Sequence, residues 1–201
     1  MLKEFFNTDK ISLPIGKIFS HFPFSPNQWS IISVFIGILG LYFAIQGEII
    51  LAFIVFLLAG LCDTIDGGLA RYTDKETKFG AFLDGSMDRF VDFLLIFSFA
   101  FLNLPDFLMP IDNWLIALAF FSLMSSFEIA YADHRGAVPG AKGLWGIFRR
   151  TERYPLLLVA LLFVNFSRSI ATYLVVFVTI MSFLNAIQLI ILTYIKSKNT
   201  K

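Results

Sequence analysis

Four aspartates lie in two pairs within an otherwise apolar part of the chain. Asp63 and Asp66 are three positions apart, and Asp84 and Asp88 are four apart. Each spacing places the two side chains of a pair on one face of a helix. A short connection between the helices would make them antiparallel neighbours. We therefore expect the four carboxylates to converge between two adjacent helices.

Such a cluster needs cations, because unpaired carboxylates are strongly disfavoured in low-dielectric surroundings. Ligands that are all oxygen atoms favour hard metals such as Mg²⁺ or Mn²⁺ over zinc. Two metal ions suit four carboxylates better than one, particularly when a phosphate group shares the coordination. The single cysteine, Cys62, provides no competing ligand set and no internal disulfide. The pattern thus predicts a site for two divalent metals.

Glycines surround the aspartates, although each glycine in a helix interior costs about 1 kcal/mol relative to alanine. They are Gly67, Gly68, Gly80 and Gly85. They indicate that something approaches the backbone closely, and tight packing between membrane helices is the alternative explanation. Arg71 ends the first of the two helices, where its guanidinium could neutralise a phosphate oxygen.

The composition predicts an all-α integral membrane protein. Of the 201 residues, 57% are hydrophobic and 15% are charged, whereas about a quarter of a soluble domain is charged. A membrane-spanning helix needs about 20 mostly apolar residues. Six segments qualify or nearly do: 28–46, 48–72, 79–103, 113–133, 153–166 and 169–195. We expect a transmembrane domain over 28–195, a tail at 196–201, and no nucleic-acid partner.

Residues 1–27 mix lysines with apolar residues and include Pro14. This pattern predicts an amphipathic segment that lies on the membrane surface before the first span. The residues that follow it indicate a helix start, with Ser25 as the N-cap and Pro26 at the first helical position.

Basic residues are distributed unevenly among the predicted loops. Of the 16 lysines and arginines, 14 fall on the side of the two termini, Arg168 lies on the opposite side, and Arg89 lies within a span. This asymmetry predicts cytoplasmic termini and places the aspartates near the cytoplasmic end of the spans.

The aspartate region resembles the signature of the CDP-alcohol phosphotransferase family. Eight fixed positions over 26 residues agree: Asp63, Asp66, Gly67, Ala70, Arg71, Gly80, Asp84 and Asp88. The stretch "SPNQWS" at 25–30 is similar to the family's P-N-x-x-T/S element. The six-span layout is similar as well.

The resemblance implies transfer of a phosphate-containing group from a CDP-linked lipid to an alcohol, with release of CMP. It implies that Asp63, Asp66 and Asp84 bind two metals, while Asp88 completes the second metal site and acts as general base. The residues that it assigns to the CDP donor are Pro26, Asn27, Gln28, Trp29, Gly67, Arg71, Thr77 and Gly80. Thr77 could instead be a turn residue, and Trp29 an interfacial anchor. A homodimer is also implied.

The acceptor alcohol is less defined. Residues 73–93 look most like members that attach inositol phosphate, and Arg150, Glu152 and Arg153 match their E-R-x-E-R element, with Arg149 replacing its first acid. In the fourth span those members usually carry S-Y-x-[KR]-A-R, whereas this chain has "SFEIAYAD". The sequence therefore leaves three other acceptors open: glycerol phosphate, a neutral polyol or an amino alcohol. The candidate acceptor residues are Glu128, Arg149, Arg150 and Arg153.

Two other classes of protein use carboxylates in a membrane. An intramembrane prenyltransferase normally has two well-separated aspartate motifs and a longer chain. A cation transporter would not require Gly67, Ala70 and Arg71 at fixed offsets from the aspartates. Formation of CMP from a CDP-lipid separates the expected enzyme from both.

Overall fold

The computed structural model describes residues 8–134 and 146–199. All the regular elements in this part of the chain are helices, as predicted, and they form two units that divide after Leu95. The first seven residues of the expected surface segment and the last two of the expected tail lie outside the described residues.

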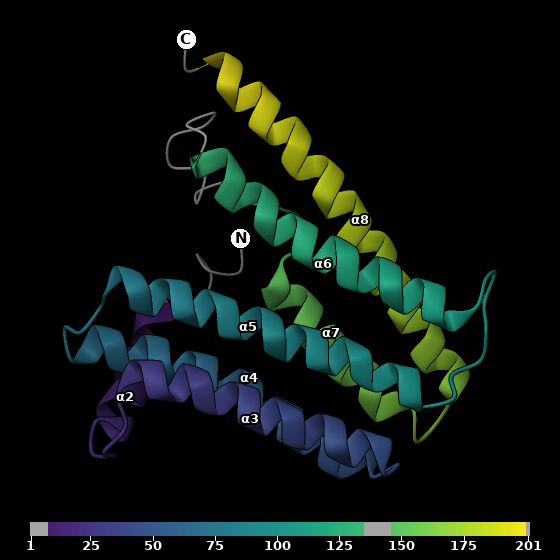
Figure 1. Cartoon of the computed structure of the whole chain (residues 1–201), viewed down its shortest axis with the longest axis horizontal. Helices are drawn as coiled ribbons and strands as arrows, with labels where there is room; N and C mark the ends of the chain where they lie inside the picture. The colour runs from purple at the N-terminus through teal and green to yellow at the C-terminus, as the bar shows by residue number, and fades with distance from the viewer. Residues whose placement is uncertain (1–7, 135–145, 200–201) are drawn as a thin grey trace. The chain divides into compact units, whose positions relative to one another are not determined.

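The first unit contains the aspartates. Its helices are α2 (Thr8–Phe19), α3 (Pro26–Ile45), α4 (Ile49–Tyr72) and α5 (Lys78–Ser98), the last of which ends just beyond the division. Figure 1 shows α4 and α5 running in opposite directions, with α2 at the end where α4 passes into α5. The expected antiparallel pair is therefore present.

Helix α3 begins as the sequence predicts. Ser25 is the N-cap, and its hydroxyl accepts a hydrogen bond from the main-chain N–H of Gln28. The side chain of Gln28 in turn accepts one from the N–H of Ser25 at 2.7 Å. This reciprocal pair satisfies two donors at the helix start, and Pro26 adds the preset backbone angle.

Two glycines of α3 allow its neighbours to approach. A Cβ atom at Gly40 would lie 3.0 Å from the ring of Phe56 on α4, and one at Gly37 would lie 3.1 Å from Leu94 on α5. Both glycines are buried. These small residues therefore serve packing within one chain.

A similar close approach joins α2 to α4. A Cβ atom at Gly16 would overlap the main-chain carbonyl of Gly68, so the two backbones meet directly. Gly68 lies two residues after Asp66. Helix α2 therefore packs against α4 close to the aspartates.

Helix α4 ends in a tight turn that reverses the chain. The N–H of Lys75 donates to the carbonyl of Ala70 at 3.0 Å, and that of Asp74 donates to the carbonyl of Arg71 at 3.4 Å. With Asp74 at a φ of 51°, these are the bonds of a Schellman motif. The motif stops α4 and leads into α5.

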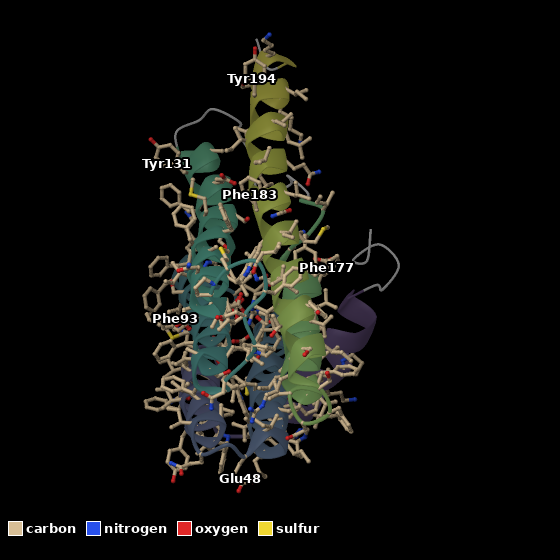
Figure 2. The ribbon with its side chains drawn as sticks, turned by 90° about the vertical axis from the view of Figure 1, so that its right-hand side faces the viewer. Glu48, Phe93, Tyr131, Phe177, Phe183 and Tyr194 are labelled. Atoms are coloured by element: carbon tan, nitrogen blue, oxygen red, sulfur yellow. The ribbon has the colours of Figure 1, made fainter. Side chains whose placement is uncertain are left out.

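The second unit contains the turn η1 (Phe99–Phe101) and the helices α6 (Ile111–His134), α7 (Arg150–Phe163) and α8 (Arg168–Asn199). Helices α6 and α7 both pack against α8. The rings of Phe121 and Phe183 meet at 5.0 Å between α6 and α8, and Figure 2 shows Tyr131 and Tyr194 near the C-terminal ends of these helices.

Four of the helices are long and apolar enough to cross a membrane: α3, α4, α6 and α8. The predicted count of six is not confirmed. Helix α5 carries several charged residues, Asp84, Asp88 and Arg89 among them. Helix α7 has 14 residues, or about 21 Å of length, which is less than the roughly 30 Å of the hydrocarbon core.

Candidate metal and nucleotide site

Three of the four signature aspartates converge between α4 and α5. Carboxylate oxygens of Asp63, Asp66 and Asp84 all lie within 4.8 Å of one another. Asp66 is buried, and the other two are half-buried. Asp88 lies one helical turn beyond Asp84 and is not a member of this group. The structure thus brings three predicted ligands together and leaves the fourth beside them.

The two oxygens of Asp66 have different surroundings. The hydroxyl of Ser30 on α3 donates a hydrogen bond of 2.5 Å to Oδ2. The other oxygen, Oδ1, is buried and has no hydrogen-bond partner among the described residues. A buried carboxylate oxygen without a donor is strongly disfavoured. A divalent cation held by the three carboxylates would satisfy it, so the site fits a metal.

Ser30 makes a contact that the sequence did not predict. It is 4% exposed, and it is the last residue of the "SPNQWS" stretch. Ser33, one turn later, is equally buried, but its hydroxyl donates to the carbonyl of Ser30. Both are serines in an apolar helix, and only the tertiary contact tells them apart.

Three of the residues assigned to the donor lie together where α3 and α5 begin. A Cβ atom at Gly80 would lie 3.0 Å from both Oδ1 of Asn27 and Oγ1 of Thr77. The hydroxyl of Thr77 accepts a hydrogen bond from the N–H of Gly80 at 2.9 Å, which is an N-cap contact. Gly80 therefore leaves room for a polar group from α3.

Arg71 lies over another glycine of the signature. Its guanidinium nitrogens are 3.6 and 3.9 Å from where a Cβ atom of Gly67 would be. Arg71 is exposed, and Gly67 directly follows Asp66. A guanidinium in this position can bind a phosphate that also reaches the carboxylate group.

Gln28 and Trp29 have structural contacts. Gln28 caps α3, as described above. The Trp29 ring packs edge-on against Phe19, Phe22 and Phe24, at centroid distances of 5.2, 6.5 and 5.7 Å. These contacts tie the end of α2 to the start of α3, and a role in donor binding stays a prediction for both residues.

The predicted acceptor residues belong to the second unit. At the start of α7, Glu152 accepts a hydrogen bond from the N–H of Arg149 at 2.9 Å. The Arg150 guanidinium lies 5.4 Å from the centroid of the Tyr154 ring. Arg153 is 3% exposed. On α6, both carboxylate oxygens of Glu128 are buried and have no hydrogen-bond partner among the described residues.

Comparison with known proteins gives a consistent result. The sequence profile described as CDP-alcohol phosphatidyltransferase matches residues 24–194. An archaetidylinositol phosphate synthase of Pyrococcus horikoshii is 35% identical over 151 residues, which cover 74% of this chain and 75% of the relative. A phosphatidylinositol phosphate synthase of Corynebacterium glutamicum is 30% identical over 149 residues, which cover 74% and 67%.

Solved structures share the fold. Phosphatidylinositol phosphate synthase of Mycobacterium tuberculosis with CDP-DAG bound superposes with a TM-score of 0.79 at 21% identity, covering 92% of this chain and 94% of the other. The same protein in complex with manganese and citrate gives a TM-score of 0.77, covering 91% and 88%.

Proposed function

Because this chain belongs to the CDP-alcohol phosphatidyltransferase family, we propose that it transfers the lipid phosphate group of a CDP-linked lipid to inositol phosphate and releases CMP. Family and apolar helices together make it an integral membrane transferase of phospholipid synthesis. The observation that carries the proposal is the convergence of Asp63, Asp66 and Asp84 within 4.8 Å.

The three convergent carboxylates would hold divalent metal, with Asp88 completing a second position. Two bound Mg²⁺ or Mn²⁺ ions would neutralise the negative charge of the pyrophosphate and stabilise the departing CMP. The unsatisfied Oδ1 of Asp66 supports metal binding at this point. The M. tuberculosis protein was crystallised with manganese, which agrees with the choice of cation.

Asp88 would act as the general base. It would take the proton from the acceptor hydroxyl as the hydroxyl oxygen attacks the phosphorus that bears the lipid. One P–O bond forms to the acceptor, and the P–O bond to CMP breaks. The position of Asp88 beside the three-carboxylate group supports this division of roles.

The donor would be held by residues around that group. Asn27, Thr77 and Gly80 would contact the nucleotide, since a side chain at position 80 would fill the space between the other two. Arg71 would bind a phosphate across Gly67. Pro26, Gln28 and Trp29 would contribute by setting the start of α3.

Four charged residues of this chain would recognise the acceptor. Arg149, Arg150 and Arg153 would bind the phosphate of inositol phosphate, since guanidinium groups pair with phosphate oxygens in two-point contacts. Glu128 would accept hydrogen bonds from acceptor hydroxyls. Its buried oxygens, which lack donors among the described residues, support that role.

Glu128 also supports an alternative acceptor. In the position where inositol-phosphate members usually carry basic residues, this chain has Ile129 and Tyr131 next to that acid. An acceptor with hydroxyls but no phosphate, such as a neutral polyol or an amino alcohol, would suit this span, and glycerol phosphate remains a further alternative. The chemistry at the metal site would be the same.

The surroundings of the site follow from the same reasoning. Residues 1–27 would form a surface segment, 28–195 the catalytic membrane domain and 196–201 a cytoplasmic tail. Both termini and the active site would face the cytoplasm of the cell, because most of the basic residues lie there. The enzyme would act as a homodimer.

Release of CMP by the purified full-length protein in lipid nanodiscs tests the proposal. CDP-diacylglycerol and CDP-archaeol would each be supplied with Mn²⁺ and with inositol phosphate, glycerol phosphate, inositol or an amino alcohol. We expect CMP release with inositol phosphate. If CMP were released only with another acceptor, the proposed acceptor would be wrong. If no pair of donor and acceptor released CMP, the proposed reaction would be wrong.

A further inference from the structure

The segment that leads into α7 is held by side chains of α8. We name residues 146–149 the lead-in segment. The N–H of Ile147 donates a hydrogen bond of 2.8 Å to Oε1 of Gln188, and the N–H of Phe148 donates one of 3.1 Å to Oδ1 of Asn185. The partners are 41 and 37 residues apart in the chain, so these bonds are tertiary contacts.

Asn185 fits closely against bare backbone at this point. A Cβ atom at Gly146 would overlap Oδ1 of Asn185 and lie 3.2 Å from its Nδ2. Asn185 is 1% exposed and lies on α8, one of the helices able to cross a membrane. A buried amide in such a helix is costly unless it has hydrogen-bond partners. Its hydrogen bond to the lead-in segment explains why a buried asparagine is tolerated in this helix.

The lead-in segment sets the position of three arginines. It ends at Arg149, and the next four residues include Arg150 and Arg153. Glu152 caps the N–H of Arg149 and thereby fixes the first turn of α7 relative to the segment. A shift of the segment would therefore move the arginine side chains with it.

We propose that Asn185 and Gln188 are positioning residues for acceptor binding. By holding the main chain of the lead-in segment, they present Arg149, Arg150 and Arg153 in the geometry that a phosphorylated acceptor needs. This inference rests on the proposed function, which gives those arginines the acceptor phosphate. Both would act through the main chain of the lead-in segment, to which their side chains are hydrogen-bonded.

The kinetic test compares substitutions at these two positions. Asn185→Leu and Gln188→Leu each remove one acceptor of a main-chain hydrogen bond. We expect the KM for inositol phosphate to rise about tenfold for the buried Asn185, which corresponds to one lost hydrogen bond. The KM for the CDP-lipid should stay unchanged. Gln188→Glu keeps an acceptor oxygen and should restore a KM close to the wild-type value.

Ser182→Ala is the matched control. Ser182 lies one turn before Asn185, is fully buried, and donates its hydroxyl hydrogen bond to the carbonyl of Val178 in the same helix. Its loss should leave both KM values unchanged. If Asn185→Leu and Gln188→Leu lowered kcat and raised both KM values alike, the residues would be merely structural and the proposal would be wrong.

Amide hydrogen exchange separates this proposal from the proposed function. In the wild-type protein without substrates, the amides of Ile147 and Phe148 should be protected, and each leucine variant should lose protection at its own partner. Gly146→Ala offers a second route, because the added methyl group would overlap Oδ1 of Asn185 and disturb the same contact without a substitution in α8. Unchanged exchange in all three variants would overturn the proposal, even if inositol phosphate proved to be the wrong acceptor.

Discussion

The carboxylate of Asp66 is held in one orientation through one oxygen, and its other oxygen is left for a metal ion. Its Oδ2 accepts a hydrogen bond from Ser30, and its Oδ1 is buried with no hydrogen-bond partner among the described residues. The hydrogen bond from Ser30 fixes the orientation of the carboxylate. Oδ1 is therefore already oriented before a metal ion binds. Residues that orient metal ligands in this way commonly strengthen metal binding.

Ser30→Ala should weaken metal binding by about 10- to 100-fold, because the Asp66 carboxylate loses its orienting donor. The Mn²⁺ concentration that gives half-maximal CMP release measures this change. Ser30→Thr keeps a hydroxyl and should retain affinity. Ser33→Ala is the control, since that buried hydroxyl donates to a main-chain carbonyl. An unchanged Mn²⁺ dependence in Ser30→Ala would show that the contact does not orient the ligand.

Asp88→Asn should lower kcat by about 10²- to 10⁴-fold, the usual contribution of a general base. Binding of the CDP-lipid should persist, because Asp63, Asp66 and Asp84 remain to hold metal. Asp63→Asn provides the contrast, since removing a convergent ligand should weaken Mn²⁺ binding itself. Single-turnover CMP release and Mn²⁺ titration separate the two effects. Turnover near the wild-type rate in Asp88→Asn would exclude this residue as the base.

At the scale of the elements, glycines determine how closely the helices pack, because they have no side chain. Gly16 lets the backbone of α2 reach that of α4 at Gly68, and Gly40 accommodates the Phe56 ring. Gly80 lets Asn27 of α3 lie beside Thr77 at the start of α5. Among the glycines around the aspartates, Gly68 therefore serves helix packing, and Gly80 leaves room for the Asn27 side chain. Helix packing is thus confirmed at Gly68, and a close approach of substrate to the backbone stays a prediction.

Gly80→Ala should impair donor binding. The added methyl group would lie 3.0 Å from Asn27 and Thr77, and about 1 kcal/mol of overpacking corresponds to a roughly fivefold rise in the KM for the CDP-lipid. The melting temperature should change little, because alanine favours the helix by a similar amount. Gly85→Ala is the comparison, since its nearest neighbour is the flexible end of Arg89. Equal KM values in the two variants would contradict a donor contact at Gly80.

At the scale of the whole molecule, charge and hydropathy predict an orientation in the bilayer. Four apolar helices anchor the chain. The turn after α4 carries Lys75 and Lys78, whereas Glu48 and Asp106 occupy connections expected on the opposite side. Figure 2 places Glu48 in the connection between α3 and α4. The predicted location of the site on the cytoplasmic face depends on this orientation.

Cysteine labelling tests the orientation. Because Cys62 is the single cysteine and is buried, a Cys62→Ser background would carry Glu48→Cys, Lys75→Cys or Asp106→Cys. A membrane-impermeant maleimide should label positions 48 and 106 in intact cells and position 75 only after permeabilisation, as the distribution of basic residues requires. The opposite pattern would reverse the predicted topology.

Local spacing by itself determined much of the site. The separation of Asp63 from Asp66, and of Asp84 from Asp88, fixes a common helix face through the 3.6-residue period. The apolar segments of α3, α4, α6 and α8 are recognisable because a bilayer demands about 20 such residues. Ser25 and Pro26 predicted the start of α3, because a helix cap is a local interaction within one turn.

Only the tertiary structure decided which side chains meet across helices. Ser30 reaches Asp66 from α3, Asn27 lies beside Gly80, and Asn185 holds the segment before α7. The helical period does not determine these contacts, because they depend on how two helix faces pack and how close glycines let their backbones come. The sequence alone therefore determined the chemistry and the membrane setting of this enzyme, and packing decided which residues orient that chemistry.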